Sequence, residues 1–334
     1  MAYCAIVPPY LLDTLSRSDD AHLAGIARRT LELDAAHRQA RTGGGQQAAG
    51  AEKRSVYDAQ HGTTVPGTLV RSEGQAAVGD DDVDRAYDHL GDTWTFYSQV
   101  YQRDSVDGKG LALLASVHYD QNYDNAFWNG DQMIFGDGDG TLFQSFTIPL
   151  DVTAHELTHG VTQYTANLDY QGQAGALNES VSDVFGSLVK QYVNKQTADQ
   201  ADWLIGAGLF EPGVQGKALR SMAAPGTAYD DPRLGKDPQP ATMDGYVDTT
   251  DDNGGVHTNS GIPNHAFYLA ATAIGGNAWE KAGLVWYRTL TSGSLPSTAD
   301  FATFANATVS AAGDVGQDVA DAVRQAWTDV KVLT

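Results

Sequence analysis

The sequence predicts an α+β fold, with a strand-rich N-terminal half and a helical C-terminal half. In the first half, residues 111–119 and 132–135 have the apolar composition of short buried strands. From Asp151 onward, apolar residues recur at helical spacing, over 151–165, 177–193, 261–274, 278–290, 298–312 and 315–329. A chain of 334 residues with 42% hydrophobic content can build two domains with cores of their own.

The N-terminal residues form a separate segment in this interpretation. Pro8-Pro9 is expected to be extended and stiff, and a helical pattern follows Asp19-Asp20. Residues 42–50, with four glycines, are typical of a flexible linker. A helix is expected over 81–102. We therefore divide the chain into 1–50, a β-rich part over 51–150 and a helical part over 151–334.

Composition limits the classes of partner. The formal net charge is −21, which argues against nucleic acids and anionic membranes as partners. Cys4 is the only cysteine of the sequence, so no disulfide framework forms within the chain. No apolar run reaches membrane-spanning length, and the N-terminus lacks the basic and apolar regions of a secretion signal. The expected location is the cytoplasm, or outside the cell by export without a conventional signal peptide.

The stretch His155-Glu156-Leu157-Thr158-His159 carries the strongest chemical signal. Residues four apart share one face of a helix, so both imidazoles can bind one metal ion. Glu156 lies beside that face and can act as a general base on a water at the open position of the metal. This arrangement is typical of zinc hydrolases. The alternative is a surface helix with two solvated histidines.

A second helical stretch can complete the site. Glu179 and Asp183 are four residues apart, and apolar residues between 177 and 189 give that helix a buried side. Glu179 can be the third zinc ligand, and Asp183 can hold the far nitrogen of a ligand histidine. Alternatively, both acids are solvated.

With these motifs, the chain resembles the thermolysin family of metalloendopeptidases from about Val56 onward. Five motifs match the family's pattern. They are the His155–His159 motif, the motif 178–183 that contains Glu179 and Asp183, the edge-strand motif 125–128, the arginine motif 218–222 and the second histidine motif 252–261. The short N-terminal segment resembles the propeptides of protealysin-type precursors. The resemblance implies that the zinc helix lies at the floor of a cleft between the two halves.

The resemblance also implies roles for individual residues. Tyr170 and His257 would stabilise the oxyanion, with Asp252 orienting His257. Asn125 and Ala126 would align the peptide substrate, and Arg220 would hold a substrate carbonyl. Asn178 would join Asp183 in supporting the zinc ligands. The pocket for the residue after the cleaved bond would be formed by apolar side chains, namely Phe143, Phe146, Val152 and Leu219.

Residues 1–50 are expected to be a propeptide that inhibits its own enzyme until it is cleaved between about Gln39 and Ser55; a permanent N-terminal helix is the alternative. Cys4 is a candidate inhibitory residue, since its thiolate can approach the zinc ion. The alternative, which we favour, is that Cys4 only packs beneath the propeptide.

The resemblance breaks down at the family's main calcium site. Its matching positions are Asp151, Lys190, Asp202, Leu204 and Ala207, and only two of them are acidic. Calcium binds six to eight oxygens, whereas Lys190 offers a cation. We expect the Lys190 ammonium group to replace the metal by pairing with Asp151 or Asp202, so a calcium requirement is uncertain.

The sequence thus predicts a zinc-dependent neutral endopeptidase that hydrolyses peptide or protein substrates, cleaves before bulky hydrophobic residues and is made as a latent precursor. One rival is a zinc aminopeptidase, but the Gly-x-Met-x-Asn stretch typical of those enzymes is absent. The other is a catalytically silent zinc-binding interaction protein, which has no chemical need for Glu156, Tyr170 and His257.

Overall fold

A mixed sheet of six strands dominates the N-terminal half of the computed structural model, which describes residues 4–40 and 53–334. The strands lie side by side in the order β1-β5-β6-β4-β2-β3. Their bounds are β1 Cys4–Ala5, β2 Arg54–Asp58, β3 Thr68–Ser72, β4 Leu113–Val117, β5 Ala126–Trp128 and β6 Met133–Phe135. β4 pairs in parallel with β2 and β6, and the other neighbours are antiparallel. The N-terminal segment therefore extends the sheet beyond β5.

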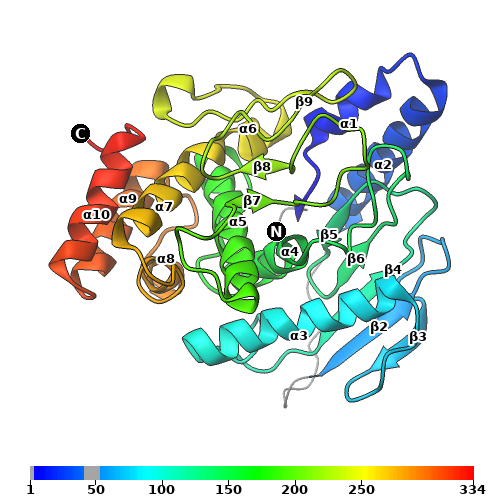
Figure 1. Ribbon diagram of the computed structural model, residues 1–334, viewed down its shortest axis with the longest axis horizontal. Coiled ribbons are helices and arrows are strands. Elements are labelled where there is room, and N and C mark those ends of the chain that lie inside the picture. The colour runs from blue at the N-terminus through cyan, green and yellow to red at the C-terminus, as the bar shows by residue number, and fades with distance from the viewer. Residues whose placement is uncertain (1–3, 41–52) are drawn as a thin grey trace.

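Helices provide most of the rest of the described chain (Figure 1). Their bounds are α1 Pro9–Ser16, α2 Ala21–Ala40, α3 Asp81–Tyr101, α4 Leu150–Gln163, α5 Gly172–Asn194, α6 Asp252–Asn259, α7 Gly261–Ile274, α8 Ala282–Thr291, α9 Phe301–Gly313 and α10 Gln317–Asp329. Short elements between α5 and α6 are β7 Leu204–Ile205, β8 Arg220–Ser221, β9 Asp230–Asp231, β10 Gly235–Lys236 and the 3₁₀ turn η1 Met243–Gly245. The predicted α+β class and its division into halves are confirmed.

The long helix α3 packs against the sheet and shows how local sequence sets an element's limits. The Asp80 side chain accepts hydrogen bonds from the backbone N–H groups of Asp82 and Val83, which caps the first turn. Three acidic residues in that turn stabilise the helix, because their negative charges lie at the positive end of the helix dipole. The helix ends where Gln102 adopts a left-handed conformation.

The helical half has an aromatic core far from the sheet. Trp286 of α8 and Trp327 of α10 are fully buried, with nearly parallel rings whose centroids are 6.1 Å apart. The Trp327 indole N–H donates to the Thr308 hydroxyl at 2.8 Å, so its polar atom is satisfied inside the core. Within the described residues, no helix combines the length and apolar character needed to cross a membrane.

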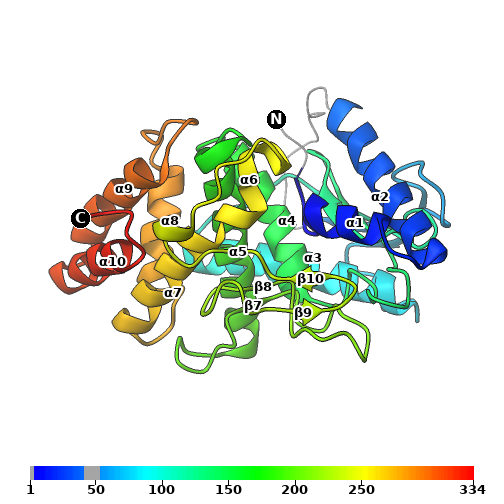
Figure 2. The ribbon, with the colours of Figure 1, turned by 90° about the horizontal axis from the view of Figure 1, so that it is seen from above.

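Helix α4 lies between the two halves, in contact with β5 on one side and α5 on the other. α1 and α2 sit together on the N-terminal half, and β1 leads from the middle of the molecule toward them (Figure 2). Because β1 also contacts α4, the N-terminal segment covers the helix that carries the predicted zinc motif.

One prediction in the N-terminal segment is half wrong. Pro8 is extended, as expected, but Pro9 is the first residue of α1. Proline suits the first helical position, because its fixed φ matches the helix and its missing N–H would have no partner there. Leu11, Leu12 and Leu15 then give α1 a buried face.

Candidate active site

The geometry of the site begins on α4, where His155, Glu156 and His159 are all buried. The Nε2 atoms of the two histidines face each other at 3.1 Å. Each far nitrogen has a partner on α5: His155 Nδ1 donates to Asp183 Oδ1 at 2.8 Å, and His159 Nδ1 donates to Asn178 Oδ1 at 2.9 Å. With the protons on Nδ1, both Nε2 lone pairs point into the same space, as metal ligands require.

Glu179 of α5 completes this group. Its carboxylate oxygens lie 3.5 Å from the Nε2 atoms of His155 and His159, and the three ligand atoms fall within 4.8 Å of one another. Glu179 Oε2 is buried and has no hydrogen-bond partner among the described residues. Two imidazoles and a carboxylate with an unsatisfied buried oxygen fit a zinc ion with three protein ligands.

A glycine allows α4 and α5 to approach closely enough for this. At Gly186, a Cβ atom would lie 2.7 Å from the backbone oxygen of Asp151 and 3.4 Å from the Cβ of His155. Any larger residue would push the helices apart and move Glu179 away from the histidines.

The same crowding shifts the pKa values of the group. Burial lowers the pKa of His159 to about 3. Burial also acts to lower the pKa of His155, but the hydrogen bond to Asp183 and the nearby Glu179 carboxylate outweigh it and raise the value to about 9. Burial raises the pKa of Glu156 to about 8. Glu156 Oε2 accepts the Trp128 backbone N–H at 3.0 Å, whereas Oε1 has no partner within the described part of the chain.

Tyr170 and His257 approach the metal group from the opposite side. The Tyr170 hydroxyl donates to Glu179 Oε1 and lies 3.3 Å from His257 Nε2. Asp252 Oδ1 accepts from His257 Nδ1 at 2.8 Å, and Asp252 Oδ2 accepts the backbone N–H of His257 at 3.0 Å. Burial acts to lower the pKa of His257, but Asp252 and Glu179 raise it to about 9.

The backbone conformation between Asp252 and His257 explains the contact of the Asp252 carboxylate with the His257 imidazole. Asp252, Asn253, Gly254 and Gly255 have φ values from 49° to 86°, a left-handed run inside α6. Asn and Gly tolerate this conformation best. The turn returns Asp252 to the imidazole five residues later.

Arg220 of β8 is fully buried beside the metal group. Its Nε and Nη2 donate to the two oxygens of Asp183, each at 2.8 Å, and its Nη1 donates to the Ile6 carbonyl at 3.0 Å. The Asn264 side chain donates to Asp183 Oδ2 at 2.8 Å. Asn264 was not among the predicted site residues, since an asparagine within the apolar pattern of α7 gives no specific signal.

The N-terminal segment contacts the residues that are predicted to bind substrate. Ile6 N–H donates to the Ala126 carbonyl at 3.1 Å, and Val7 N–H donates to Asn125 Oδ1 at 2.9 Å. The Asn125 amide donates in turn to Asp34 of α2 at 3.0 Å. Asp34 was also missed, although its spacing from Leu23 and Ala27 placed an acid on the apolar face of the helix.

The predicted pocket residues are all buried and belong to one hydrophobic cluster that also contains Ile6; they are Phe143, Phe146, Val152 and Leu219. Phe143 and Phe146 lie with ring centroids 5.8 Å apart. The structure therefore brings the pocket residues and the N-terminal segment into one core.

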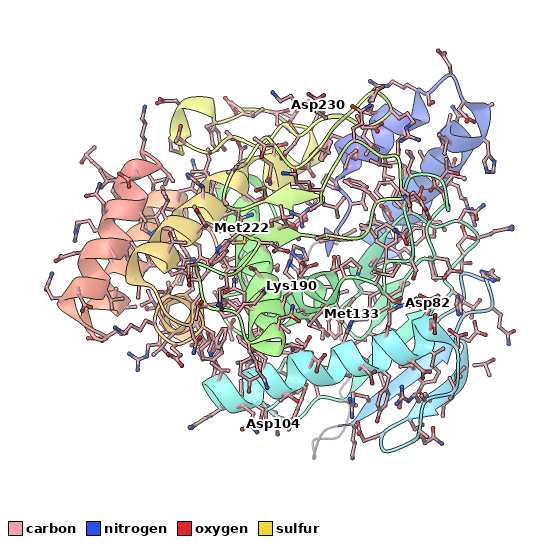
Figure 3. All side chains as sticks on the ribbon, in the orientation of Figure 1. Asp82, Asp104, Met133, Lys190, Met222 and Asp230 are labelled. Atoms are coloured by element: carbon pink, nitrogen blue, oxygen red, sulfur yellow. The ribbon has the colours of Figure 1, made fainter. Side chains whose placement is uncertain are left out.

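Lys190 lies on α5, near the centre of the molecule (Figure 3). Its ammonium group contacts Asp151 Oδ2 at 2.7 Å, Asp202 Oδ1 at 2.9 Å and the Leu204 carbonyl at 2.6 Å. Burial acts to lower its pKa, but Asp151 and Asp202 raise it above the ordinary value of 10.5. Asp151 Oδ1 accepts the Gly206 N–H at 3.0 Å, so this buried carboxylate is held on both oxygens.

Two predictions fall outside what the structure describes. The Cys4 backbone forms part of β1, but its side chain is outside the described atoms. Most of the predicted cleavage range, 39–55, lies in 41–52, which is outside the described residues.

This site and fold define a zinc peptidase with a two-part catalytic body. The chain matches the family model of the thermolysin metallopeptidase catalytic domain over residues 29–163 and that of its alpha-helical domain over residues 166–332. The chain belongs to the thermolysin family of metallopeptidases, and it is a zinc metalloendopeptidase.

Individual relatives agree with this assignment. An extracellular metalloprotease of Pectobacterium carotovorum is 53% identical, with 98% of this chain and 96% of that protein covered. A thermolysin of Alicyclobacillus acidocaldarius is 41% identical over 83% of this chain, which matches 50% of its length. The solved precursor of protealysin, a metalloproteinase from Serratia proteamaculans, has a TM-score of 0.93 and 55% identity, covering 99% of this chain and 100% of that one.

Proposed function

We propose that the chain is a latent neutral endopeptidase that cleaves peptide bonds before bulky hydrophobic residues. The carrying observation is the group of His155, His159 and Glu179, with ligand atoms within 4.8 Å of one another beside Glu156. Zinc bound there supplies Lewis-acid chemistry, polarising the attacked carbonyl and the attacking water.

Glu156 takes the proton of the attacking water and delivers it to the leaving amine. His257 Nε2 and the Tyr170 hydroxyl donate to the developing oxyanion, and Asp252 keeps His257 protonated and oriented. Asp183 and Asn178 fix the ligand histidines, which supports their assignment as positioning residues.

Substrate alignment follows from the contacts that the N-terminal segment makes. The Ala126 backbone pairs with an incoming strand, and Asn125 and Arg220 hold its polar backbone groups. The apolar pocket of Phe143, Phe146, Val152 and Leu219 favours a bulky hydrophobic residue after the cleaved bond.

Residues 1–50 are the propeptide and linker in this proposal, and the catalytic body comprises 51–150 and 151–334. The propeptide inhibits its own enzyme by covering α4 and pairing with β5. Cleavage near residues 39–55 removes it. The Pectobacterium relative's name supports action outside the cell, and peptidase activity in culture fluid rather than in washed cells would test that location.

We also propose that the family's main calcium site is replaced here by the Lys190 ion pairs. The three oxygen partners of its ammonium group support this.

Replacing Glu156 by Gln tests the function. The variant should keep one zinc per chain but lose about a hundred- to ten-thousand-fold in hydrolysis of an N-blocked peptide, and it should remain full length. Equal hydrolysis by both proteins would overturn the mechanism. Failure of the wild type on N-blocked peptides, with cleavage of free N-termini, would instead indicate an aminopeptidase.

A further inference from the structure

Residues Ala5, Ile6 and Val7 meet the proposed substrate-binding groups in consecutive order. The Ala5 carbonyl oxygen lies 3.1 Å from His257 Nε2. The next carbonyl, of Ile6, accepts from Arg220 at 3.0 Å, and the next amide, of Val7, donates to Asn125 at 2.9 Å. Consecutive residues of the segment thus contact successive substrate-binding groups, in addition to covering the site.

The direction of the segment is also that of an added strand. β1 pairs with β5 antiparallel, with Ala5 opposite Phe127. The Ile6 N–H donates to the Ala126 carbonyl at 3.1 Å. The Ile6 carbonyl accepts from Arg220, and the Ile6 side chain is fully buried. These backbone contacts place Ile6 where the bulky residue after a cleaved bond would lie.

We infer that Ala5–Ile6 occupies the scissile position and that the zinc-loaded precursor hydrolyses this bond within its own molecule. The inference rests on the proposed function and adds a cleavage site separate from the one expected near residues 39–55. The carbonyl that faces the oxyanion donor His257 belongs to Ala5, so the bond from Ala5 to Ile6 is the one exposed to attack.

The chemistry of this step is complete with water as co-reactant. Water adds to the Ala5 carbonyl carbon, and Glu156, whose buried Oε1 has no hydrogen-bond partner among the described residues, accepts its proton. The C–N bond then breaks, and Glu156 returns the proton to the Ile6 nitrogen. The acid proton on Ala5 then passes to the amine, so the products are a carboxylate on Ala5 and an ammonium group on Ile6, which donates to the Ala126 carbonyl.

The two products are retained very differently. Upstream of the bond, the described contacts of the short fragment are its pairing with β5, its contact with α4, the packing of Ala5 in a small cluster with Phe127, and the contact of the Ala5 carbonyl with His257. Downstream, α1 and α2 anchor the chain through buried leucines, through Arg29 with Asp120 and through Tyr123 with Asp34. The fragment ending at Ala5 leaves, whereas the chain that begins at Ile6 stays bound as a product. Latency therefore outlasts this cut.

Intact-mass measurement of the zinc-loaded precursor over time, with N-terminal sequencing, tests the inference. We expect a chain, or a released propeptide fragment, that begins at Ile6. Its first-order rate constant should not change over a tenfold range of protein concentration, because the cut is intramolecular. The Glu156→Gln precursor should not form it.

Absence of any product beginning at Ile6, in a preparation that hydrolyses an N-blocked peptide after maturation, would overturn the inference and leave the proposed function intact. Failure to hydrolyse that peptide would overturn both. An apparent first-order rate constant that rises in proportion to protein concentration would also overturn the inference, because it would mean cleavage by another molecule.

Matched variants at Ile6 test the register. Ile6→Leu should retain the cut, whereas Ile6→Gly should slow it by at least about 10- to 200-fold, the effect of losing a single methylene from an apolar pocket. Equal rates in both would contradict the assignment of Ile6 to the pocket.

Hydrogen exchange in the zinc-free precursor gives a readout that needs no catalysis. Residues 4–7 should be protected in the wild type and should lose protection in Ile6→Asp, while α7–α10 stay unchanged. Rapid exchange of residues 4–7 in the wild type would show that the segment does not hold this register.

Discussion

One interface between α4 and α5 holds two buried charged groups that are neutralised differently. At one end, His155, His159 and Glu179 leave lone pairs and an unpartnered oxygen directed at a common point. One turn away, Asp151 is neutralised by Lys190 of the facing helix. An external cation with an open position can activate a reactant, whereas an ammonium group with all its donors used can only hold the helices together.

The largest expected effect comes from removing a ligand at the zinc end. His159→Ala should lose bound zinc and reduce hydrolysis of an N-blocked peptide to background, because two ligands cannot hold a catalytic ion. Zinc content and hydrolysis are measured on the same sample. Lys190→Met is the matched control, and it should keep both. Zinc loss in the control as well would mean that the two groups are not independent.

Lys190→Met should instead act on stability. It leaves the Asp151 carboxylate buried without its cation, which costs about 3–5 kcal/mol when one partner of a buried pair is removed. Thermal or denaturant unfolding of the Glu156→Gln background, which cannot digest itself, measures this. Asp202→Asn is the milder comparison, since Asp202 is half exposed. Equal losses in the two variants would contradict the central role of Asp151.

Substituting the partners of the ligand histidines should have a smaller effect. Asn178→Ala should weaken zinc affinity about 10- to 100-fold, because the hydrogen bond that keeps the His159 proton on Nδ1 is lost. Competition with a chelating dye reports the affinity. Unchanged affinity would show that Asn178 serves packing alone.

The smallest effects concern calcium and alkaline pH. Chelating calcium while sparing zinc should leave the melting temperature unchanged in the wild type, whereas Lys190→Glu should make it rise with added calcium, since a carboxylate joins Asp151 and Asp202. A large drop in the wild type would refute the replacement of calcium by Lys190.

The pH dependence follows from the raised pKa of Lys190. A group whose folded pKa exceeds its ordinary value stabilises the fold fully below that value and loses the effect as pH rises through the folded pKa. The stability advantage of the wild type over Lys190→Met should therefore shrink above about pH 10.5. An advantage that grows with pH would contradict the pairing.

Sequence patterns predicted the parts of this molecule that depend on local periodicity. The helices over 151–165 and 177–193 correspond to α4 and α5 because a buried helix face repeats every three to four residues. A pairing of Lys190 with Asp151 or Asp202 was expected because a cation stands where the family has an acid, and the structure shows both pairs.

Long-range contacts were harder to predict. The pairing of Cys4–Ala5 with β5 joins residues over 120 positions apart, and a two-residue strand has no periodicity of its own. Asp34 contacts Asn125 only because α2 docks there. Asn264 reaches Asp183 through the packing of α7 on α5. Tertiary packing creates each of these contacts.

Returning zinc to the metal-free, mature protein, with calcium chelated throughout, tests the central claim most directly. Hydrolysis of an N-blocked peptide should return in proportion to added zinc and reach its maximum at one zinc per chain. Recovery that requires calcium, or that needs two zinc ions per chain, would contradict an enzyme with one catalytic zinc and a lysine in place of its structural metal.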